Sequence, residues 1–267
     1  MARVIEIGDA GDPRLDDFRD LSAADRRPDR PGGRGLVIAE GVVVVQRMLD
    51  SAYPVRALLG VRRRIDALAA ELAAVDAPAY VASAEVMAEV VGFHLNRGVL
   101  AVADRAPQPD LDAMAQARVL AVLEGVNDHE NLGSIFRNAA ALGVGGVLLG
   151  PGCADPLYRR SVRVSMGHVL RVPFAAVPEP WPDSLGLLRG RGFRVLALTP
   201  RADASELRVH SMAGGERVAL LLGSEGHGLT ESAMTASDQL IRIPMAAGVD
   251  SLNVATAAAV AFHALQG

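Results

Sequence analysis

The sequence contains no lysine, since all 27 of its basic residues are arginine. Without lysine the chain cannot form a Schiff base with a carbonyl substrate, and it has neither a P-loop lysine nor a lysine general base. Its single cysteine, Cys153, excludes an intramolecular disulfide and a cysteine-cluster metal site. The histidines show no metal-ligand spacing, and no H-E-x-x-H pair or EF-hand loop occurs. We therefore expect a protein that works without a bound metal.

Long apolar runs are also missing from the chain. No run approaches the roughly 20 residues that span a bilayer, and the first residues lack the apolar stretch of a signal peptide. Half of the residues are hydrophobic and 22% are charged, which is the composition of a globular protein with a sizeable core. We therefore expect a cytoplasmic protein with no membrane partner. A length of 267 residues allows one large domain or two smaller ones.

The charge of the chain is weakly negative, at −4, and does not by itself indicate a nucleic-acid-binding protein. Its arginines nevertheless cluster in three places, at residues 26–34, 62–64 and 159–163. Such clusters are more often solvated faces than binding sites. Guanidinium groups, however, match the oxygens of phosphates in geometry and charge. Contact with nucleic-acid phosphates therefore stays open, with Arg26, Arg27, Arg62 and Arg63 as the candidates in the first two clusters.

The N-terminal part of the chain alternates short β-branched or aliphatic runs with helical patterns. Strands are predicted at residues 35–39, 55–61, 79–82 and 98–103. Helices are predicted at residues 12–21, 40–51, 65–74 and 84–91, and Ser83 is suited to cap the last of them. This alternation indicates a small α/β domain over residues 1–106. A proline-rich stretch then indicates a linker over residues 107–116.

The remaining residues, 117–267, indicate a second α/β domain. It opens at residues 119–124 with a nearly continuous apolar run, typical of a parallel strand that is buried on both faces. Further strands are predicted at residues 147–149, 172–176, 194–198, 218–223 and 240–243. Helices are predicted at residues 132–142, where Asn131 is a plausible cap, and at 157–164, 184–191, after Gly228 and at 252–265. The pattern predicts a mostly parallel, doubly wound sheet, whose ligands bind at the carboxyl ends of the strands.

Polar loops follow several of these predicted strands, at residues 127–131, 199–200, 223–228 and 244–251. The loop at residues 223–228 has three glycines in six residues, so its backbone can approach a ligand closely. A mobile surface turn is the alternative interpretation of that loop. A dinucleotide site is not indicated, because the glycines at residues 143–146 follow a helix and precede a strand, the reverse of the phosphate-binding order.

Three segments together resemble the SpoU (TrmH-like) branch of the SPOUT methyltransferases. Members of this family transfer a methyl group from S-adenosyl-L-methionine to a ribose 2′-oxygen in RNA. The first segment, residues 131–139, has the family's Asn-x-Gly-x-x-x-Arg spacing; the others are residues 222–229, and residues 243–245 followed by 251–254. The resemblance covers residues 118–266. The N-terminal part resembles the ribosomal-protein-like RNA-binding domain that is often fused to this family.

The resemblance implies a C-terminal trefoil knot with helices on both faces of the sheet, and a site for the methyl donor. The implied donor contacts are Thr199, Gly223, Ile243, Met245 and Leu252. A side chain at residue 223 would crowd the adenosine of the donor. The implied catalytic residues are Arg137, which is central, and Asn131, Glu225, Ser251 and Asn253. Arg163 is implied to meet RNA.

We therefore expect an enzyme that methylates a ribose 2′-oxygen in structured RNA and that acts as a homodimer. The fused N-terminal domain favours 23S ribosomal RNA over transfer RNA as the substrate. Two alternatives stay open, a transfer-RNA or base methyltransferase of the same superfamily and a non-catalytic RNA-binding protein that keeps the knot. The alternative interpretation of Arg137 is a surface arginine on an amphipathic helix. The alternative interpretation of Asn131, Ser251 and Asn253 is that each caps a helix.

Overall fold

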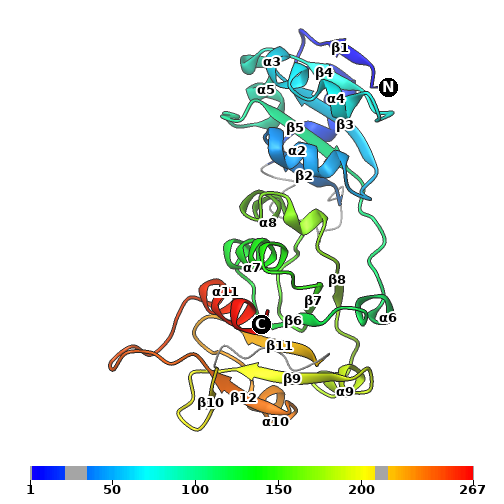
Figure 1. Cartoon of the computed structure of the whole chain (residues 1–267). Coiled ribbons are helices and arrows are strands. Elements are labelled where there is room, and N and C mark those ends of the chain that lie inside the picture. The colour runs from blue at the N-terminus through cyan, green and yellow to red at the C-terminus, as the bar shows by residue number, and fades with distance from the viewer. Residues whose placement is uncertain (1, 22–34, 208–215, 267) are drawn as a thin grey trace. The chain divides into compact units, whose positions relative to one another are not determined.

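The computed structural model describes residues 2–21, 35–207 and 216–266, which form two compact units (Figure 1). The first unit comprises Met1–Pro107 and Leu157–Arg171, and the second comprises Gln108–Pro156 and Val172–Gly267. The first stretch of the first unit therefore ends at the predicted linker. The return of residues 157–171 to the first unit has no counterpart in the sequence-based division.

The first unit contains a five-stranded mixed sheet in the order β1-β4-β3-β5-β2. In this order the strands are Val4–Glu6, Ala79–Val81, Val55–Gly60, Val99–Ala103 and Val37–Glu40. Strands β1, β4 and β3 are parallel, whereas β5 is antiparallel to both of its neighbours. The helices are η1 (Pro13–Phe18), α2 (Val42–Leu49), α3 (Arg62–Asp66), α4 (Ala69–Leu72) and α5 (Ala84–Val91). Residues from η1, α5 and the sheet, among them Phe18, Met87 and Leu100, share one buried core.

Local signals predicted this unit well where they were strong. Helix α5 has the predicted bounds because the Ser83 hydroxyl accepts a hydrogen bond from the Val86 amide at 3.3 Å. Two predictions were wrong in detail, since the helix predicted at residues 12–21 is a short 3₁₀ helix and the one at 65–74 is split into α3 and α4. Strand β1 was not predicted. Its three residues are too few to show a period.

Residues 157–171 complete the first unit with α8 (Arg159–Val164) and a 3₁₀ turn, η2 (His168–Leu170). The guanidinium of Arg159 lies 3.6 Å from the buried carboxylate of Glu40 and 4.5 Å from the ring centroid of Phe93. Farther along the segment, Arg171 pairs with Asp50 at 3.0 Å. The segment is thus held to the first unit by both a buried and an exposed ion pair.

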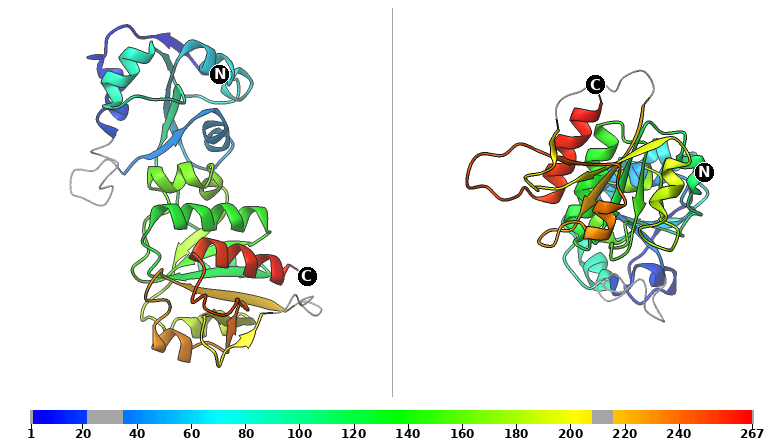
Figure 2. Two further views of the ribbon diagram at one scale, coloured as in Figure 1. Left: turned by 90° about the vertical axis from the view of Figure 1, so that its left-hand side faces the viewer. Right: turned by 90° about the horizontal axis from the view of Figure 1, so that it is seen from below.

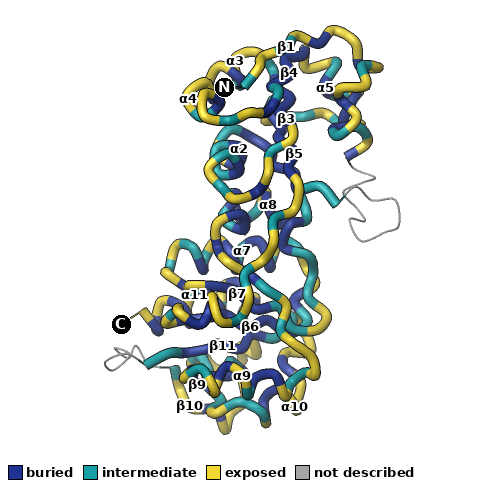
Figure 3. The backbone as a smooth tube through the Cα atoms, turned by 90° about the vertical axis from the view of Figure 1, so that its right-hand side faces the viewer, coloured by how far each residue is buried: buried dark blue, intermediate teal, exposed yellow. Residues whose placement is uncertain are grey.

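The second unit is built on a seven-stranded sheet in which every assigned strand pair is parallel. In spatial order the strands are β10 (Ser205–Glu206), β12 (Gln239–Arg242), β9 (Phe193–Leu198), β11 (Arg217–Gly223), β6 (Val119–Glu124), β7 (Gly146–Leu149) and β8 (Phe174–Ala176). The central strands β6 and β11 are buried over nearly their whole length (Figure 3). Their continuous apolar runs follow from burial on both faces.

Helices cover both faces of this sheet, as Figures 1 and 2 show. Helices α7 (His129–Ala141) and α11 (Val254–Leu265) lie together on one face, whereas α9 (Leu185–Arg189) and α10 (Glu231–Thr235) lie on the other. A short helix, α6 (Leu111–Met114), precedes β6. The predicted α/β fold with a parallel sheet and helices on both faces is confirmed. No described helix is long and apolar enough to cross a bilayer.

Helix α7 begins earlier than the sequence predicted. The carboxylate of Asp128 accepts hydrogen bonds from the amides of Glu130 and Asn131, at 2.8 and 2.9 Å, and so caps the helix. The prediction that Asn131 is the cap was therefore wrong. Both Asp and Asn satisfy a helix start, and the residue that comes first in the chain takes the role here. The side chain of Asn131 is consequently available for other contacts.

Candidate functional site

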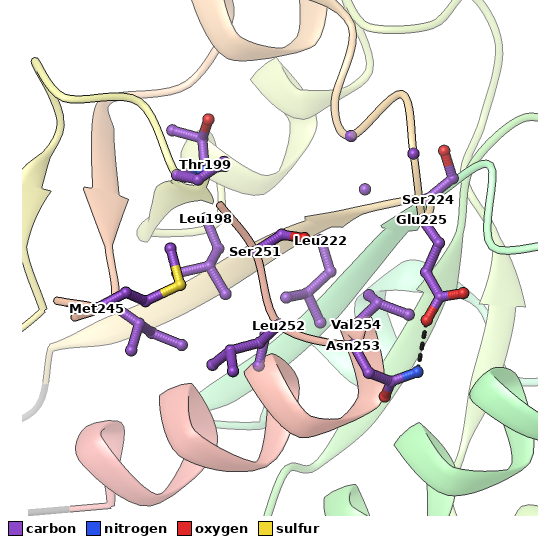
Figure 4. Close-up of a pocket in the computed structure, with 16 residues that line it drawn as sticks. Leu198, Thr199, Leu222, Ser224, Glu225, Met245, Ser251, Leu252, Asn253 and Val254 are labelled. Atoms are coloured by element: carbon purple, nitrogen blue, oxygen red, sulfur yellow. Dashed lines mark hydrogen bonds between the residues drawn. The ribbon is translucent and has the colours of Figure 1, made fainter. Parts of the chain in front are cut away.

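A cavity of about 450 Å³ opens at the carboxyl ends of β9, β11 and β12, against the start of α11 (Figure 4). Parallel strands end at the same edge of a sheet, so the loops that follow them meet there. All five residues predicted to contact the methyl donor line the cavity: Thr199, Gly223, Ile243, Met245 and Leu252. Of the predicted catalytic residues, Glu225, Ser251 and Asn253 also line it.

The loop that follows β11 doubles back on its own first residue. Ser224 and Gly228 form an isolated bridge, in which the Gly228 amide donates to the Ser224 carbonyl at 3.1 Å. A Cβ atom on Gly223 would lie 2.3 Å from the carbonyl carbon of Gly228 and 2.4 Å from the amide nitrogen of Leu229. Glycine is therefore required at residue 223 by the backbone of its own loop, and crowding of an adenosine is not needed to explain it.

The side chain of Asn253 joins three parts of the site. Its amide nitrogen donates to the Asn131 side-chain oxygen at 2.7 Å and to a Glu225 carboxylate oxygen at 2.5 Å (Figure 4 shows the second bond). Its oxygen accepts from the amides of Ala255 and Thr256, at 3.0 and 3.1 Å, and so caps α11. Asn253 is thus a helix cap, as its alternative interpretation held, and it also links α7 to the loop after β11.

Arg137 lies on α7 but does not line the cavity. Its side chain is exposed, and within the described residues no hydrogen bond or ion pair involves its guanidinium. Its neighbour Asn138 instead donates to the carbonyl of Ala255 at 2.9 Å and so fastens α7 to α11. The structure therefore brings together Asn131, Glu225 and Asn253 and leaves Arg137 outside that group.

The arginines predicted to bind RNA differ in their exposure and in the ion pairs that they form. Arg163 on α8 and Arg63 on α3 are exposed. Arg62 forms ion pairs with Glu6 and Asp66, the second at 3.6 Å, so part of its charge is engaged within the first unit. Arg26 and Arg27 lie outside the described residues.

Sequence reasoning missed a buried carboxylate at the end of β6. Glu124 accepts hydrogen bonds from the Trp181 indole at 2.6 Å and from both the hydroxyl and the amide of Thr230, each at 2.8 Å. The available signal was an acidic residue closing an otherwise apolar run at residues 119–124. A charged residue in a strand of this kind is rarely buried unless it is paired.

The described residues offer neither a group of metal ligands nor an activated cysteine nucleophile. Within residues 2–21, 35–207 and 216–266, no three histidine, cysteine or acidic side chains are grouped so as to hold a metal ion. Burial raises the pKa of the Cys153 thiol, which lies 3.4 Å from the Leu123 carbonyl oxygen. A thiol with a raised pKa is a poor nucleophile at neutral pH.

The model of the SpoU rRNA Methylase family matches residues 118–263, which is more than half of the chain. The protein belongs to the SpoU methylase family. An uncharacterized tRNA/rRNA methyltransferase of Mycobacterium tuberculosis is 60% identical to this SpoU protein over 262 residues, covering 97% of this chain and 91% of the relative. A Bacillus subtilis 23S rRNA (guanosine(2553)-2′-O)-methyltransferase is 30% identical over 156 residues, covering 58% of this chain and 61% of that enzyme.

Solved structures of the family have the same fold. The SpoU methyltransferase AviRb of Streptomyces viridochromogenes superposes with a TM-score of 0.75 at 26% identity, covering 95% of this chain and 96% of that chain. The same enzyme in complex with its cofactor, S-adenosyl-L-methionine (AdoMet), superposes with a TM-score of 0.74 at 24% identity, covering 95% and 97%. SpoU methyltransferases use this cofactor, and AdoMet is the methyl donor of the present RNA methyltransferase.

The residues that line the cavity of the SpoU protein match the chemistry of AdoMet, which has an apolar purine ring and a positively charged sulfonium. Leucine side chains at residues 198, 222 and 252 line it with apolar surface suited to a purine ring. Gly223 and Gly228 leave backbone groups accessible to a ligand. The carboxylate of Glu225 places a negative charge at the cavity, which favours a positively charged ligand. Small-molecule sites have this composition, mostly apolar with a few polar groups that fix orientation.

Proposed function

We propose that this protein transfers a methyl group from AdoMet to a ribose 2′-oxygen in structured RNA, with 23S ribosomal RNA as the substrate. The observation that carries the proposal is the Asn253 amide, which joins the helix of the first motif to the loop of the second at the edge of the cavity. The ribose specificity is supported by the Bacillus subtilis relative, whose name gives the 2′-oxygen of a 23S guanosine as its target.

Residues of three loops would hold the donor in this proposal. Thr199 follows β9, Gly223 ends β11, and Ile243, Met245 and Leu252 lie in the long loop between β12 and α11. When bound, AdoMet supplies an electrophilic methyl group carried on a sulfonium ion. Asn131, Glu225, Ser251 and Asn253 would form a polar frame that orients the ribose and the sulfonium relative to each other.

Arg137 would act on the RNA. Arginine is often written as the general base in this family, but a guanidinium in a protein keeps its proton. We therefore assign Arg137 to an RNA phosphate and to the negative charge that develops on the 2′-oxygen. In this step the 2′-oxygen forms its bond to the methyl carbon as the carbon–sulfur bond breaks, S-adenosylhomocysteine leaves, and the hydroxyl proton passes to water. The exposure of Arg137, with no ion pair among the described residues, is consistent with a partner that the RNA supplies.

The first unit would bind the substrate. Its exposed arginines include Arg63 and, in the segment that returns to this unit, Arg163. We propose the same role, contact with RNA, for Arg62, Arg26 and Arg27. Guanidinium contacts to phosphates fix the position of an RNA without reading its sequence, so this unit would raise affinity and leave the chemistry to the second unit.

The knot and the dimer are further parts of this proposal. The loops at residues 223–229 and 243–253 would be the knotted loops of the second unit. A second copy of the chain would cover exposed apolar side chains of the loop after β12 and of α11, among them Val249 and Val260. The setting of the reaction would be the cytoplasm.

The proposal is tested with tritium-labelled AdoMet and with transcripts of 23S ribosomal RNA and transfer RNA. A 2′-O-methyl group blocks alkaline cleavage of the adjacent phosphodiester, so we expect label in an alkali-resistant dinucleotide from 23S RNA. Label in mononucleotides would indicate base methylation, and label in transfer RNA would indicate the other substrate. Binding of AdoMet and RNA without transfer, in conditions where a known family member is active, would identify a non-catalytic binding protein.

A further inference from the structure

Glu124 is the last residue of β6 and is only 5% exposed. Both of its carboxylate oxygens accept hydrogen bonds. One oxygen accepts from the Trp181 indole at 2.6 Å and from the Thr230 hydroxyl at 2.8 Å, and the other accepts from the Thr230 amide at 2.8 Å. Bonds to an ionised acceptor are about twice as strong as neutral ones, so the buried charge is well compensated.

The direction of the Thr230 hydroxyl bond follows from its neighbours. The Thr230 oxygen accepts from the Ala233 amide at 3.2 Å, as the cap of α10, and lies 3.1 Å from the Ser232 hydroxyl, which can donate to it. An ionised Glu124 oxygen, in contrast, can only accept. A hydroxyl has one proton, and in this arrangement that proton points at Glu124. The carboxylate therefore receives three donors, two of them from a single residue.

Glu124 contacts both ends of the loop that lines the cavity. At the start of the loop, Gly223 lies opposite Glu124 in the parallel register of β11 and β6. At its end, Thr230 follows Leu229 directly and is bound by the Glu124 side chain. The residues between, among them Ser224 and Glu225, line the cavity. The carboxylate thus sets how the loop closes.

We propose that Glu124 is a positioning residue for AdoMet, acting through Thr230 on the loop at residues 224–229, with Trp181 as the second support of its carboxylate. The inference rests on the proposed function, because that assigns the cavity to the donor. Glu124 does not line the cavity, so it would act through the loop rather than by touching the donor.

The test is Glu124→Gln, which keeps the shape of the side chain. A glutamine can accept from two of the donors, but its NH₂ group then faces the Thr230 amide, and the loop loses its anchor. We expect AdoMet binding, measured by calorimetry, to weaken by about tenfold or more, which corresponds to about 1.4 kcal/mol. RNA affinity is expected to stay unchanged. The emission of Trp181, the only tryptophan, should shift in the ligand-free protein, since its indole partner changes.

The matched control is Glu231→Gln, one residue after Thr230. Glu231 forms an exposed ion pair with Arg201 at 3.0 Å, so the same chemical change should alter neither AdoMet affinity nor tryptophan emission. A second pair approaches the contact from the other side. Thr230→Val removes the hydroxyl donor and should weaken AdoMet binding, whereas Thr230→Ser keeps it and should restore affinity.

Unchanged AdoMet affinity in both Glu124→Gln and Thr230→Val, with only the melting temperature lowered, would overturn the inference and leave Glu124 a purely structural residue. Leu252→Arg, a substitution in the cavity itself, separates this from failure of the proposed function. If Leu252→Arg abolishes AdoMet binding while Glu124→Gln does not change it, the inference alone fails. If Leu252→Arg also leaves binding intact, the assignment of the cavity fails, and the inference fails with it.

Discussion

The amide of Asn253 donates a hydrogen bond to the side-chain oxygen of Asn131, 122 residues earlier in the chain, at 2.7 Å. The same nitrogen donates to Glu225, while the Asn253 oxygen caps α11. Both polar atoms of the Asn253 side chain therefore form hydrogen bonds within the protein. The two predicted motifs that it joins lie in different parts of the sequence and meet only because α7 and α11 pack side by side on one face of the sheet.

Asn253→Asp separates the cap of α11 from the link to Asn131 and Glu225. Aspartate caps a helix as well as asparagine does, so the melting temperature should change little. The new oxygen would face two acceptors, and we expect methyl transfer to fall about ten- to a hundredfold, from a loss of about 1–3 kcal/mol. Rates are measured with saturating AdoMet and RNA. Full activity in this variant would show that the link has no part in the reaction.

Gly223→Ala should abolish AdoMet binding. The added Cβ would lie 2.3 Å from the backbone of Gly228, and backbone cannot move aside as the end of a flexible side chain can. Calorimetry measures the binding. Gly186→Ala on α9 is the control, because its Cβ would have no neighbour closer than 3.9 Å. That variant should bind AdoMet normally and gain up to about 1 kcal/mol of stability from helix propensity. Normal binding in Gly223→Ala would contradict this account of the loop.

Arg137→Ala should lower turnover about a hundred- to a thousandfold while AdoMet affinity stays unchanged, if the guanidinium acts on charge that develops in the transition state. Stability should not change, since the side chain is exposed. Arg137→Lys should remain badly impaired, because lysine loses the planar fork that holds a phosphate and an oxygen together. Nearly full activity in the lysine variant would show that charge alone suffices. Full activity in the alanine variant would remove Arg137 from the catalytic residues.

Glu40→Gln should destabilise the first unit by about 3 kcal/mol, because it removes the charge beside the largely buried guanidinium of Arg159. RNA affinity should fall with it, since Arg163 lies on the same helix, α8. Asp50→Asn is the control, as it breaks an exposed pair with Arg171 and should cost less than about 1 kcal/mol. Urea denaturation and RNA titration make the two measurements. Equal effects of the two variants would show that the buried pair is not what holds residues 157–171.

Val260→Arg should convert a dimer into a monomer in sedimentation experiments. Val260 lies on α11 and is 42% exposed, and a charge there would have to be buried in an interface. Val43 on α2 is 44% exposed, so Val43→Arg is the same change at an equally exposed site. That variant should sediment like the natural protein. A natural protein that sediments as a monomer at micromolar concentration would contradict the proposed dimer.

Much of the second unit was predictable from local sequence. Its central strands are buried on both faces, so they appear as uninterrupted apolar runs, and the strand predicted at residues 119–124 has those bounds. Helix α5 of the first unit was equally clear because Ser83 marks its start. Short elements escaped prediction. Strand β10 has two residues and β1 has three, and pairing with a distant strand stabilises them rather than any pattern of their own.

The sequence by itself determined which loops carry polar and glycine residues, and the family resemblance named eight residues that line one cavity, together with Arg137 and Asn131, which do not line it. Only the tertiary structure decided what those residues contact. Asn131 is free of the capping role because Asp128 takes it, Gly223 is required by the returning backbone of Gly228, and Glu124 holds a residue 106 positions away. The reason is physical: periodicity and capping signals act within a few residues, whereas these contacts depend on the path by which separate strands reach one edge of the sheet.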